Sequence, residues 1–306
     1  MDRLPPLYDI GRRIDQTGPQ GGQPRKPVRW MIRGLFLQHL YQLSDPQLED
    51  QLIDRLSFRR FAGLPLEQQV PDFSTFWRFR QALAEGGHLE DLFREVTGQL
   101  EAKGLILKRG TVVDATIIES AGRPLSDEAR EELEQDPSSQ IDTDADSTQK
   151  GGTHYLGYKG HIGVDVGSKL IRRVSFTEAS PHDSTQLETL LSGDERAIFG
   201  DKAYPSRDLK LRCRKEGIYY GILDKAYRNR PLSGSQKRRN TRKRRVRRYG
   251  EHPFSAIKQR YGMAVATAKT KIRNKAQFIM AALCWNIERS ISWAKKEWKV
   301  TPAAAT

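Results

Sequence analysis

Apolar side chains recur at helical spacing through most of the first hundred residues. The pattern starts at Val28, and each apolar stripe is separated from the next by a short polar turn. The first stripe consists of Met31, Ile32, Leu35, Phe36 and Leu40. We therefore predict an all-α domain over residues 28–103. Residues 1–27, rich in Pro, Gly and Gln, predict a flexible arm.

Capping signals in the sequence define where two of these helices begin. Ser44-Asp45-Pro46-Gln47 predicts an N-cap at Ser44 with Gln47 completing a capping box, and Pro71-Asp72-Phe73-Ser74 opens a later helix. Short helices joined by tight turns permit a helix-turn-helix. Arg78 and Arg80 could then face DNA phosphates, and dimerisation or plain packing are the alternatives for this domain.

From residue 104 the pattern changes to strands that alternate with helices. Residues 111–118 are β-branched and apolar on both faces, as in a central strand, and two further strands joined by Gly167-Ser168 form a hairpin. The remaining predicted elements are strands at 197–201 and 218–223 and helices at 182–192, 204–217 and 271–295. This order predicts an α/β fold over 104–295: a mixed sheet flanked by helices, with the first and fourth strands as neighbours. Residues 296–306 form a tail.

Residues 119–153 interrupt the pattern with Pro, Ser and acids. Nine acidic residues and two Arg lie between 121 and 149. We interpret this segment as an acidic surface insertion, mostly mobile, with one short helix at 126–134.

The distribution of charged residues along the chain limits the kinds of partner that the protein can have. The chain of 306 residues carries 52 Lys and Arg against 38 Asp and Glu, a net charge of +14. Twelve of the cations fall in the run 225–248, which contains no acid. Such asymmetry indicates a nucleic acid as partner rather than a membrane surface, because the run has no apolar helical face. The partner predicted for the chain as a whole is double-stranded DNA. Two distant cysteines, no signal peptide and no apolar span indicate a cytoplasmic protein without a disulfide framework or zinc site.

Three acids stand out against these patterns. Asp114 lies in the middle of the first strand, where it must be bonded to backbone, paired, metal-bound or at a cleft. Asp201 ends the fourth strand and would sit beside it. Glu251 is the first acid after Asp224, and Lys258 follows two helical turns later on the same face. Pro253 favours a helix start near Gly250, with Arg247 just before it.

Carboxylates that meet at one point repel one another unless a divalent ion neutralises them. Oxygen ligands suit Mg²⁺ or Mn²⁺, and two such ions stabilise the attacking and leaving oxygens of an in-line displacement at phosphorus. Lys258 would offer a charge to a nearby phosphate. The basic run would bind the DNA backbone and confer affinity rather than sequence choice.

Several ordered motifs resemble the DDE transposases of bacterial insertion sequences, of the IS-five type within the IS-four-like group. They are Leu56-Ser57-Phe58-Arg59-Arg60-Phe61, Val113-Asp114-Ala115-Thr116, Gly157-Tyr158-Lys159-Gly160-His161-Ile162-Gly163-Val164-Asp165, Gly200-Asp201-Lys202-Ala203-Tyr204 and the spaced set Arg247, Glu251 and Lys258. The resemblance covers residues 28 to 295. It implies an RNase H-like catalytic domain.

The resemblance also assigns roles. It implies that Asp114, Asp201 and Glu251 are the catalytic metal ligands, with Arg247 and Lys258 as auxiliary phosphate contacts. The family often has Tyr three places before its Arg, where this chain has Arg244. Lys159 and His161 should lie on a strand beside Asp114, either touching substrate or packed in the sheet.

Together these observations predict a two-metal DNA transposase that cleaves transposon ends and joins them to target DNA. Joining two ends requires a homodimer or larger assembly. The alternatives are a domesticated, non-catalytic DNA-binding protein and an RNase H-like nuclease without strand transfer. The residues expected to bind DNA are Lys237, Arg238, Arg239, Arg242, Lys243, Arg244, Arg245 and Arg248.

Overall fold

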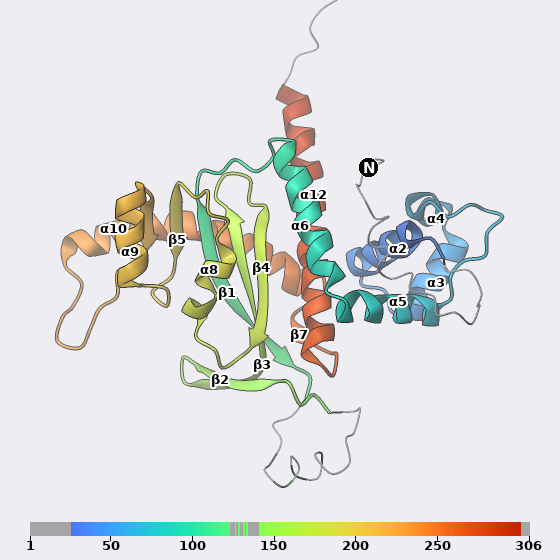
Figure 1. The fold of residues 1–306 in the computed structure, drawn as a ribbon, viewed down its shortest axis with the longest axis horizontal. Helices are drawn as coiled ribbons and strands as arrows, with labels where there is room; N and C mark the ends of the chain where they lie inside the picture. The colour runs from blue at the N-terminus through green and yellow to red at the C-terminus, as the bar shows by residue number, and fades with distance from the viewer. Residues whose placement is uncertain are drawn as a thin grey trace, which may run out of the picture.

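A seven-stranded mixed sheet lies between two groups of helices in the computed structural model (Figure 1). The structure describes residues 26–122, the single residues 126, 128, 131 and 133, and residues 141–300, with backbone alone for 294–300. The strands are β1 (Thr111–Ser120), β2 (Asp146–Lys150), β3 (Thr153–Asp165), β4 (Ile171–Glu178), β5 (Ala197–Gly200), β6 (Tyr219–Ile222) and β7 (Val265–Ala266).

The topology is the expected RNase H-like one. β3 lies antiparallel between β1 and β4, and β5 and β6 continue the sheet parallel to β1. The predicted adjacency of the first strand to the strand that ends before Asp201 is therefore confirmed. The helical sequence that follows β6 crosses behind the sheet and returns to β1 through β7.

The acidic insertion was predicted to be mostly mobile, and its last part is instead a strand. β2 pairs with the start of β3 across the turn Gly151-Gly152, where both glycines have positive φ. Polar side chains on both faces of β2 leave no apolar alternation for the sequence to reveal. The helix predicted at 126–134 falls mostly outside the described residues.

The N-terminal helices follow their predicted start signals. The Ser44 hydroxyl accepts from the Gln47 N–H at 3.3 Å, and the Gln47 side chain accepts from the Ser44 N–H at 2.8 Å, so the capping box is present. The Asp72 carboxylate caps its helix by accepting from the Thr75 N–H at 2.7 Å. These helices are α2 (Val28–Tyr41), α3 (Asp45–Asp54), α4 (Leu56–Ala62), α5 (Phe73–Glu85) and α6 (His88–Ala102).

The long helix α12 (Lys271–Val300) joins these helices to the sheet. It packs on α2, α5 and α6 and on β4. Phe278 is fully buried 5.5 Å from the ring of Phe176, and it fills the space over Gly160, where a β-carbon would come within 2.4 Å of its ring. The helices and the sheet thus share one continuous hydrophobic cluster. The other helical segments are η1 (Asp183–Gln186), α8 (Leu187–Leu190), α9 (Arg207–Glu216), α10 (Gly234–Arg247), η2 (Arg248–Gly250), α11 (Glu251–Ser255) and η3 (Ala256–Arg260).

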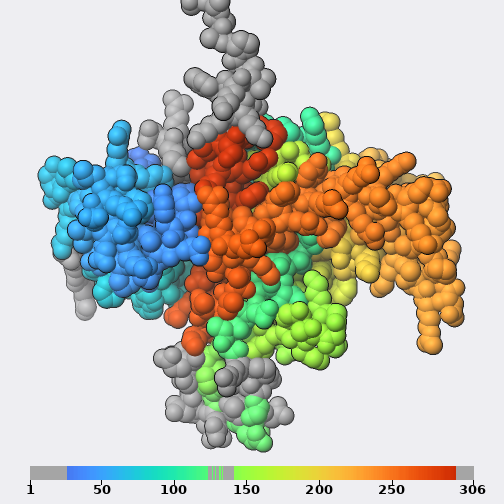
Figure 2. Space-filling view, turned by 180° about the vertical axis from the view of Figure 1, so that it is seen from behind, coloured from blue at the N-terminus to red at the C-terminus, as the bar shows by residue number. Residues whose placement is uncertain are grey.

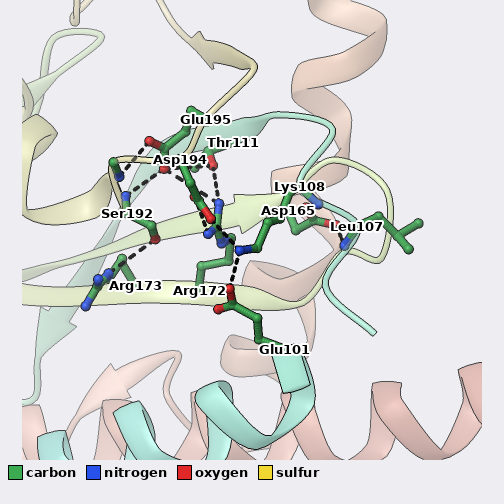
Figure 3. Close-up of polar contacts among 11 residues, drawn as sticks. Glu101, Leu107, Lys108, Thr111, Asp165, Arg172, Arg173, Ser192, Asp194 and Glu195 are labelled. Carbon is green, nitrogen blue, oxygen red and sulfur yellow. Dashed lines mark hydrogen bonds and ion pairs between the residues drawn. The ribbon is translucent and has the colours of Figure 1, made fainter. Parts of the chain in front are cut away.

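A buried polar network fixes the start of β1 (Figure 3). Arg172 on β4 pairs with Asp194 at 2.5 Å and lies 3.7 Å from the buried carboxylate of Glu195, which also accepts from Thr111. Lys108, just before β1, pairs with Asp194 at 2.7 Å. Because breaking a buried pair leaves an uncompensated charge, this network holds β1 firmly three residues before Asp114.

Both cysteines, Cys213 and Cys284, are buried thiols, as expected. No helix within the described ranges is both long enough and apolar enough to cross a bilayer.

Candidate active site

Asp114 occupies the centre of the sheet with a mostly buried carboxylate. Its side chain is 14% exposed, Oδ2 accepts from the Arg247 guanidinium at 3.0 Å, and Oδ1 accepts from the Ala115 N–H at 3.1 Å. Burial raises the pKa of Asp114 to about 6, and the nearby Asp201 carboxylate adds to the rise, although Arg247 and the Ala115 N–H oppose it. The carboxylate is therefore only partly compensated by the protein itself.

Asp201 follows β5 directly and lies beside Asp114. The parallel register places Thr111 opposite Ile198 and Val112 opposite Phe199, and two more steps bring Asp114 opposite Asp201. Asp201 Oδ1 accepts from the Ala203 N–H at 2.6 Å, which fixes the turn after the strand. The two aspartates thus come from adjacent strands at one end of their pairing.

Glu251 approaches the aspartates from the helical side. It begins α11 immediately after Gly250, and Gly250 packs closely on β1. A β-carbon at Gly250 would lie 3.1 Å from Val112 Cγ1 and 3.8 Å from Asp114 Oδ2. The Glu251 side chain is 57% exposed, and its carboxylate lies 3.6 Å from the Arg247 guanidinium. A glycine at 250 therefore lets Glu251 enter near Asp114 while its carboxylate remains accessible.

Arg247 lies within a helix, whereas the sequence placed it just before one. It is the last residue of α10, and residues 247–251 all keep right-handed helical dihedrals through η2. Pro253 is the third residue of α11, in the first turn, where a missing N–H breaks no helical bond. The continuous helical path makes Arg247 and Glu251 an i,i+4 pair, and the guanidinium bridges Glu251 and Asp114.

The donor set fits a hard divalent cation. All three side chains offer carboxylate oxygens, the ligands that Mg²⁺ and Mn²⁺ prefer. Burial and, to a smaller extent, the like charge of Asp201 raise the pKa of Asp114. In the part of the chain that the structure describes, no three His, Cys, Asp or Glu side chains close around a common point. The Arg247 guanidinium lies between Asp114 and Glu251 instead, so a cation would replace it there.

Two lysines, Lys258 and Lys150, lie near each other and near β1. Lys258 lies in η3, and burial lowers the pKa of its ammonium group while Glu119 raises it and Lys150 lowers it further. Lys150, at the end of β2, also acts electrostatically on Asp114. The sequence interpretation missed Lys150, because it belongs to the polar segment expected to be mobile.

Lys159 and His161 lie on β3 beside β1, as expected, and both are packed in the sheet. The ring of His161 is fully buried 3.0 Å from the Thr177 hydroxyl, and burial lowers its pKa to about 4. The Lys159 ammonium donates to the Pro181 carbonyl at 2.8 Å and pairs with Asp183 at 3.1 Å. These contacts favour the packing alternative for both residues.

The cationic helix α10 docks on the sheet through polar residues. Asn240 exchanges two hydrogen bonds with the backbone of Asp224, and the Lys243 ammonium donates to the Ile222 carbonyl at 2.6 Å. Lys243 is 5% exposed, so its predicted role as a DNA contact is wrong; it anchors the helix. The other cations predicted to bind DNA are exposed: Lys237, Arg238, Arg239, Arg242, Arg244, Arg245 and Arg248.

In the N-terminal helices, the Arg80 guanidinium is occupied by contacts within the domain. It makes a bidentate pair with Asp45, both contacts at 2.7 Å, and bonds to Gln38. Arg78 is exposed and contacts Ser74 on its own helix. Of the two arginines, only Arg78 remains available to phosphate.

A mostly buried carboxylate in the sheet lies beside an exposed cationic helix, and clustered cations of this kind attract a polyanion such as DNA. The family model described as "Transposase DDE domain" matches residues 106–287, and one described as "Transposase domain (DUF772)" matches residues 1–82. The chain therefore belongs to the DDE transposase family. A solved structure of the piggyBac transposase synaptic complex with hairpin DNA is similar to this chain at 12% identity and a TM-score of 0.47, covering 96% of this chain and 73% of that one.

The raised pKa of Asp114 predicts a pH-dependent stability. Because the folded carboxyl binds its proton more tightly than an ordinary Asp, its contribution is complete below about pH 4 and is lost as the pH rises through about 6. Between pH 4 and 7, without metal, wild type should lose up to about 3 kcal/mol relative to Asp114→Asn. Urea unfolding in chelator across this range measures the difference, and a difference that stays constant with pH would contradict the assigned environment.

Proposed function

We propose that Asp114, Asp201 and Glu251 are the catalytic metal ligands of this DNA transposase, and that they hold two Mg²⁺ or Mn²⁺ ions. The observation that carries the proposal is the mostly buried carboxylate of Asp114, which strand pairing brings beside Asp201. Arg247, the Ala115 N–H and Lys150 compensate its charge only in part. A strand interior accepts such a group when function requires it. When bound, the ions would activate the attacking oxygen and stabilise the charge that develops at phosphorus.

The surrounding cations supply the phosphate contacts. Arg247 already bridges Asp114 and Glu251, so it can exchange these carboxylates for a phosphate when a cation takes its place. Its planar guanidinium suits a bidentate contact with phosphate. Lys150 acts electrostatically on Asp114, and Lys258 lies near Glu119 further along the same strand. We assign both ammonium groups as phosphate contacts.

The reaction has two displacements. Water attacks the phosphodiester at the transposon end, the bond to the leaving 3′-oxygen breaks, and that oxygen takes a proton to become a free 3′-hydroxyl. The 3′-hydroxyl then attacks a target phosphodiester, forming a new bond to phosphorus and releasing a target 3′-hydroxyl. Each displacement exchanges one oxygen on phosphorus for another, so no redox partner is needed.

Helix α10 would bind the duplex backbone. Six exposed cations lie on α10 and a seventh, Arg248, lies in η2. The α10–α11 segment forms one band across the back of the molecule (Figure 2). The last residue of α10, Arg247, contacts Asp114. A DNA backbone bound along α10 would therefore extend to the carboxylates of the candidate active site. Contacts of this kind supply affinity without reading bases.

The wider organisation follows from the same chemistry. We propose that the 28–103 helices contribute DNA contact or dimerisation, that the active form is a homodimer or larger assembly on two transposon ends, and that the enzyme works in the bacterial cytoplasm as an IS-five-type transposase. The exposed Arg78 on α5 supports a DNA contact by this region.

The decisive experiment is cleavage of a labelled duplex that carries the ends of the element encoding this chain. Wild type should cut in Mg²⁺ or Mn²⁺, stop in chelator, and join ends to added target DNA. Asp114→Ala, Asp201→Ala and Glu251→Gln should each lose about 10³-fold in rate, since each removes a ligand worth several kcal/mol at the transition state. Asp208→Asn, an exposed acid on α9, serves as the control and should cut normally.

The outcomes separate the alternatives. Tight binding without cutting in any metal would indicate a non-catalytic DNA-binding protein. Cutting without joined products would indicate a nuclease. Normal cutting by Glu251→Gln would remove that residue from the site while leaving the aspartates in it.

The basic helix makes its own prediction for the salt dependence of duplex binding. Arg242→Ala and Arg245→Ala should each lower the slope of log K against log salt by about 1, because each removes one phosphate contact. Lys103→Ala is the matched control, since Lys103 is an exposed cation that follows α6, outside the basic helix, and its loss should leave the slope unchanged. Fluorescence anisotropy between 50 and 200 mM salt measures the slopes, and equal slopes for all variants would show that DNA lies elsewhere.

A further inference from the structure

A cavity of about 290 Å³ lies where α5 meets the start of α12, away from the acids. Figure 1 shows α5 reaching the end of α12 at which Lys271 begins that helix. The cavity exists because small side chains face each other there: Ala84 on α5, Ala276 on α12 and Ala268 in the loop before it. Its volume suits one small ring system and is too small for a folded element.

One wall of the cavity is an exposed indole. Trp77, Gln81 and Ala84 recur at helical spacing and turn one face of α5 to the cavity. The Trp77 side chain is 43% exposed, although indoles usually bury their apolar surface. The Arg273 guanidinium lies over its ring at 5.8 Å and is oriented by a 2.8 Å hydrogen bond to Gln81. The ring is therefore held in place while part of its surface stays open to a ligand.

The rest of the lining is cationic and amide-bearing. Asp45 neutralises Arg80, whereas Lys269 and Arg273 form no ion pair with any residue in the described ranges. The Gln277 amide makes no hydrogen bond there either. An aromatic surface beside two uncompensated cations and a free amide matches a nucleotide: a flat base to stack, base edges to bond and a phosphate to neutralise.

The cavity lies on a continuation of the strand that carries Asp114. β7 pairs with Glu119 and Ser120 at the end of β1, and the lining loop 267–269 follows β7 directly. Six residues of strand separate Asp114 from Ser120, a span of about 20 Å. A DNA strand in the active site would need only a few nucleotides to reach the cavity.

We propose that this cavity binds one unstacked base of single-stranded DNA, stacked on Trp77, with the adjoining phosphate on Lys269 and Arg273. Single-stranded DNA is favoured because a duplex must first unpair and unstack a base at a cost of a few kcal/mol. The proposal rests on the chain being a DNA transposase, and it concerns strand binding rather than metal chemistry.

The test compares three probes by anisotropy on the full chain in chelator, where no cutting occurs. The probes are a 20-mer of thymidylate, a 20-mer of abasic deoxyribose phosphate with the same charge, and a 20-base-pair duplex. Wild type should prefer thymidylate to the abasic strand. Trp77→Ala should abolish that preference, weakening thymidylate binding about 5- to 150-fold while duplex binding changes less than about 2-fold. Trp77→Phe should keep most of the preference, because phenylalanine also offers an aromatic face. That result would show that the loss in Trp77→Ala comes from the missing ring and not from misfolding.

Phe73→Ala is the matched control, because Phe73 is one turn earlier on α5, is 50% exposed against 43% for Trp77, and lies outside the cavity lining. It should behave as wild type with all three probes. The proposal is overturned if wild type binds the abasic strand as well as thymidylate, since the cations alone would then explain binding. It is also overturned if Trp77→Ala keeps the preference, or if Phe73→Ala loses as much as Trp77→Ala. Binding is measured here without cleavage. A result against the cavity proposal can therefore be told apart from a result against the proposed metal ligands.

Discussion

The carboxylate of Asp114 sits in a strand whose preceding residues, Val112 and Val113, are fully buried. A charge in such a position must be compensated. The structure compensates it with an ion pair to Arg247 at 3.0 Å and, less strongly, with the Ala115 N–H and Lys150, while Asp201 adds a like charge nearby. Gly250 packs closely on Val112 and so brings the helical segment from Arg247 to Glu251 against β1. This packing places Arg247 next to the Asp114 carboxylate. The buried network of Arg172 and Glu195 contacts the first residue of β1 and so fixes the strand on the N-terminal side of Asp114.

The same helix links two functions. Its outer face carries the exposed cations, and its inner face carries Asn240, Lys243 and Arg247, which fasten it to the sheet and to Asp114. Duplex bound on the outer face and phosphate at the acids would therefore act on one rigid element. On the opposite side α12 ties the N-terminal helices to β4 through Phe278, so the Trp77 cavity is held in a fixed relation to β1.

Apolar patterning and start signals were enough to predict five of the seven strands, the N-terminal helices and the pairing of the strands that carry Asp114 and precede Asp201. The strands β2 and β7 were not predicted. The predicted features depend on local periodicity and capping, which a single sequence displays. The helical position of Arg247 was missed because Pro253 was read as a barrier to an earlier helix, although a 3₁₀ turn accommodates it. Lys243 was misassigned because a run of identical charges does not show which member turns inward. Lys150 and the Trp77 cavity arise from contacts between distant segments, to which no local pattern corresponds.

Locating Mn²⁺ by anomalous diffraction in crystals of the protein bound to DNA ends would test the account most directly. The account predicts anomalous peaks about 2 Å from oxygens of Asp114, Asp201 and Glu251, with the Arg247 guanidinium moved from Asp114 to a DNA phosphate. Mn²⁺ bound elsewhere, with Arg247 still paired to Asp114, would contradict it. The two aspartates would then be structural groups, and the catalytic centre of this transposase would have to be sought at other residues.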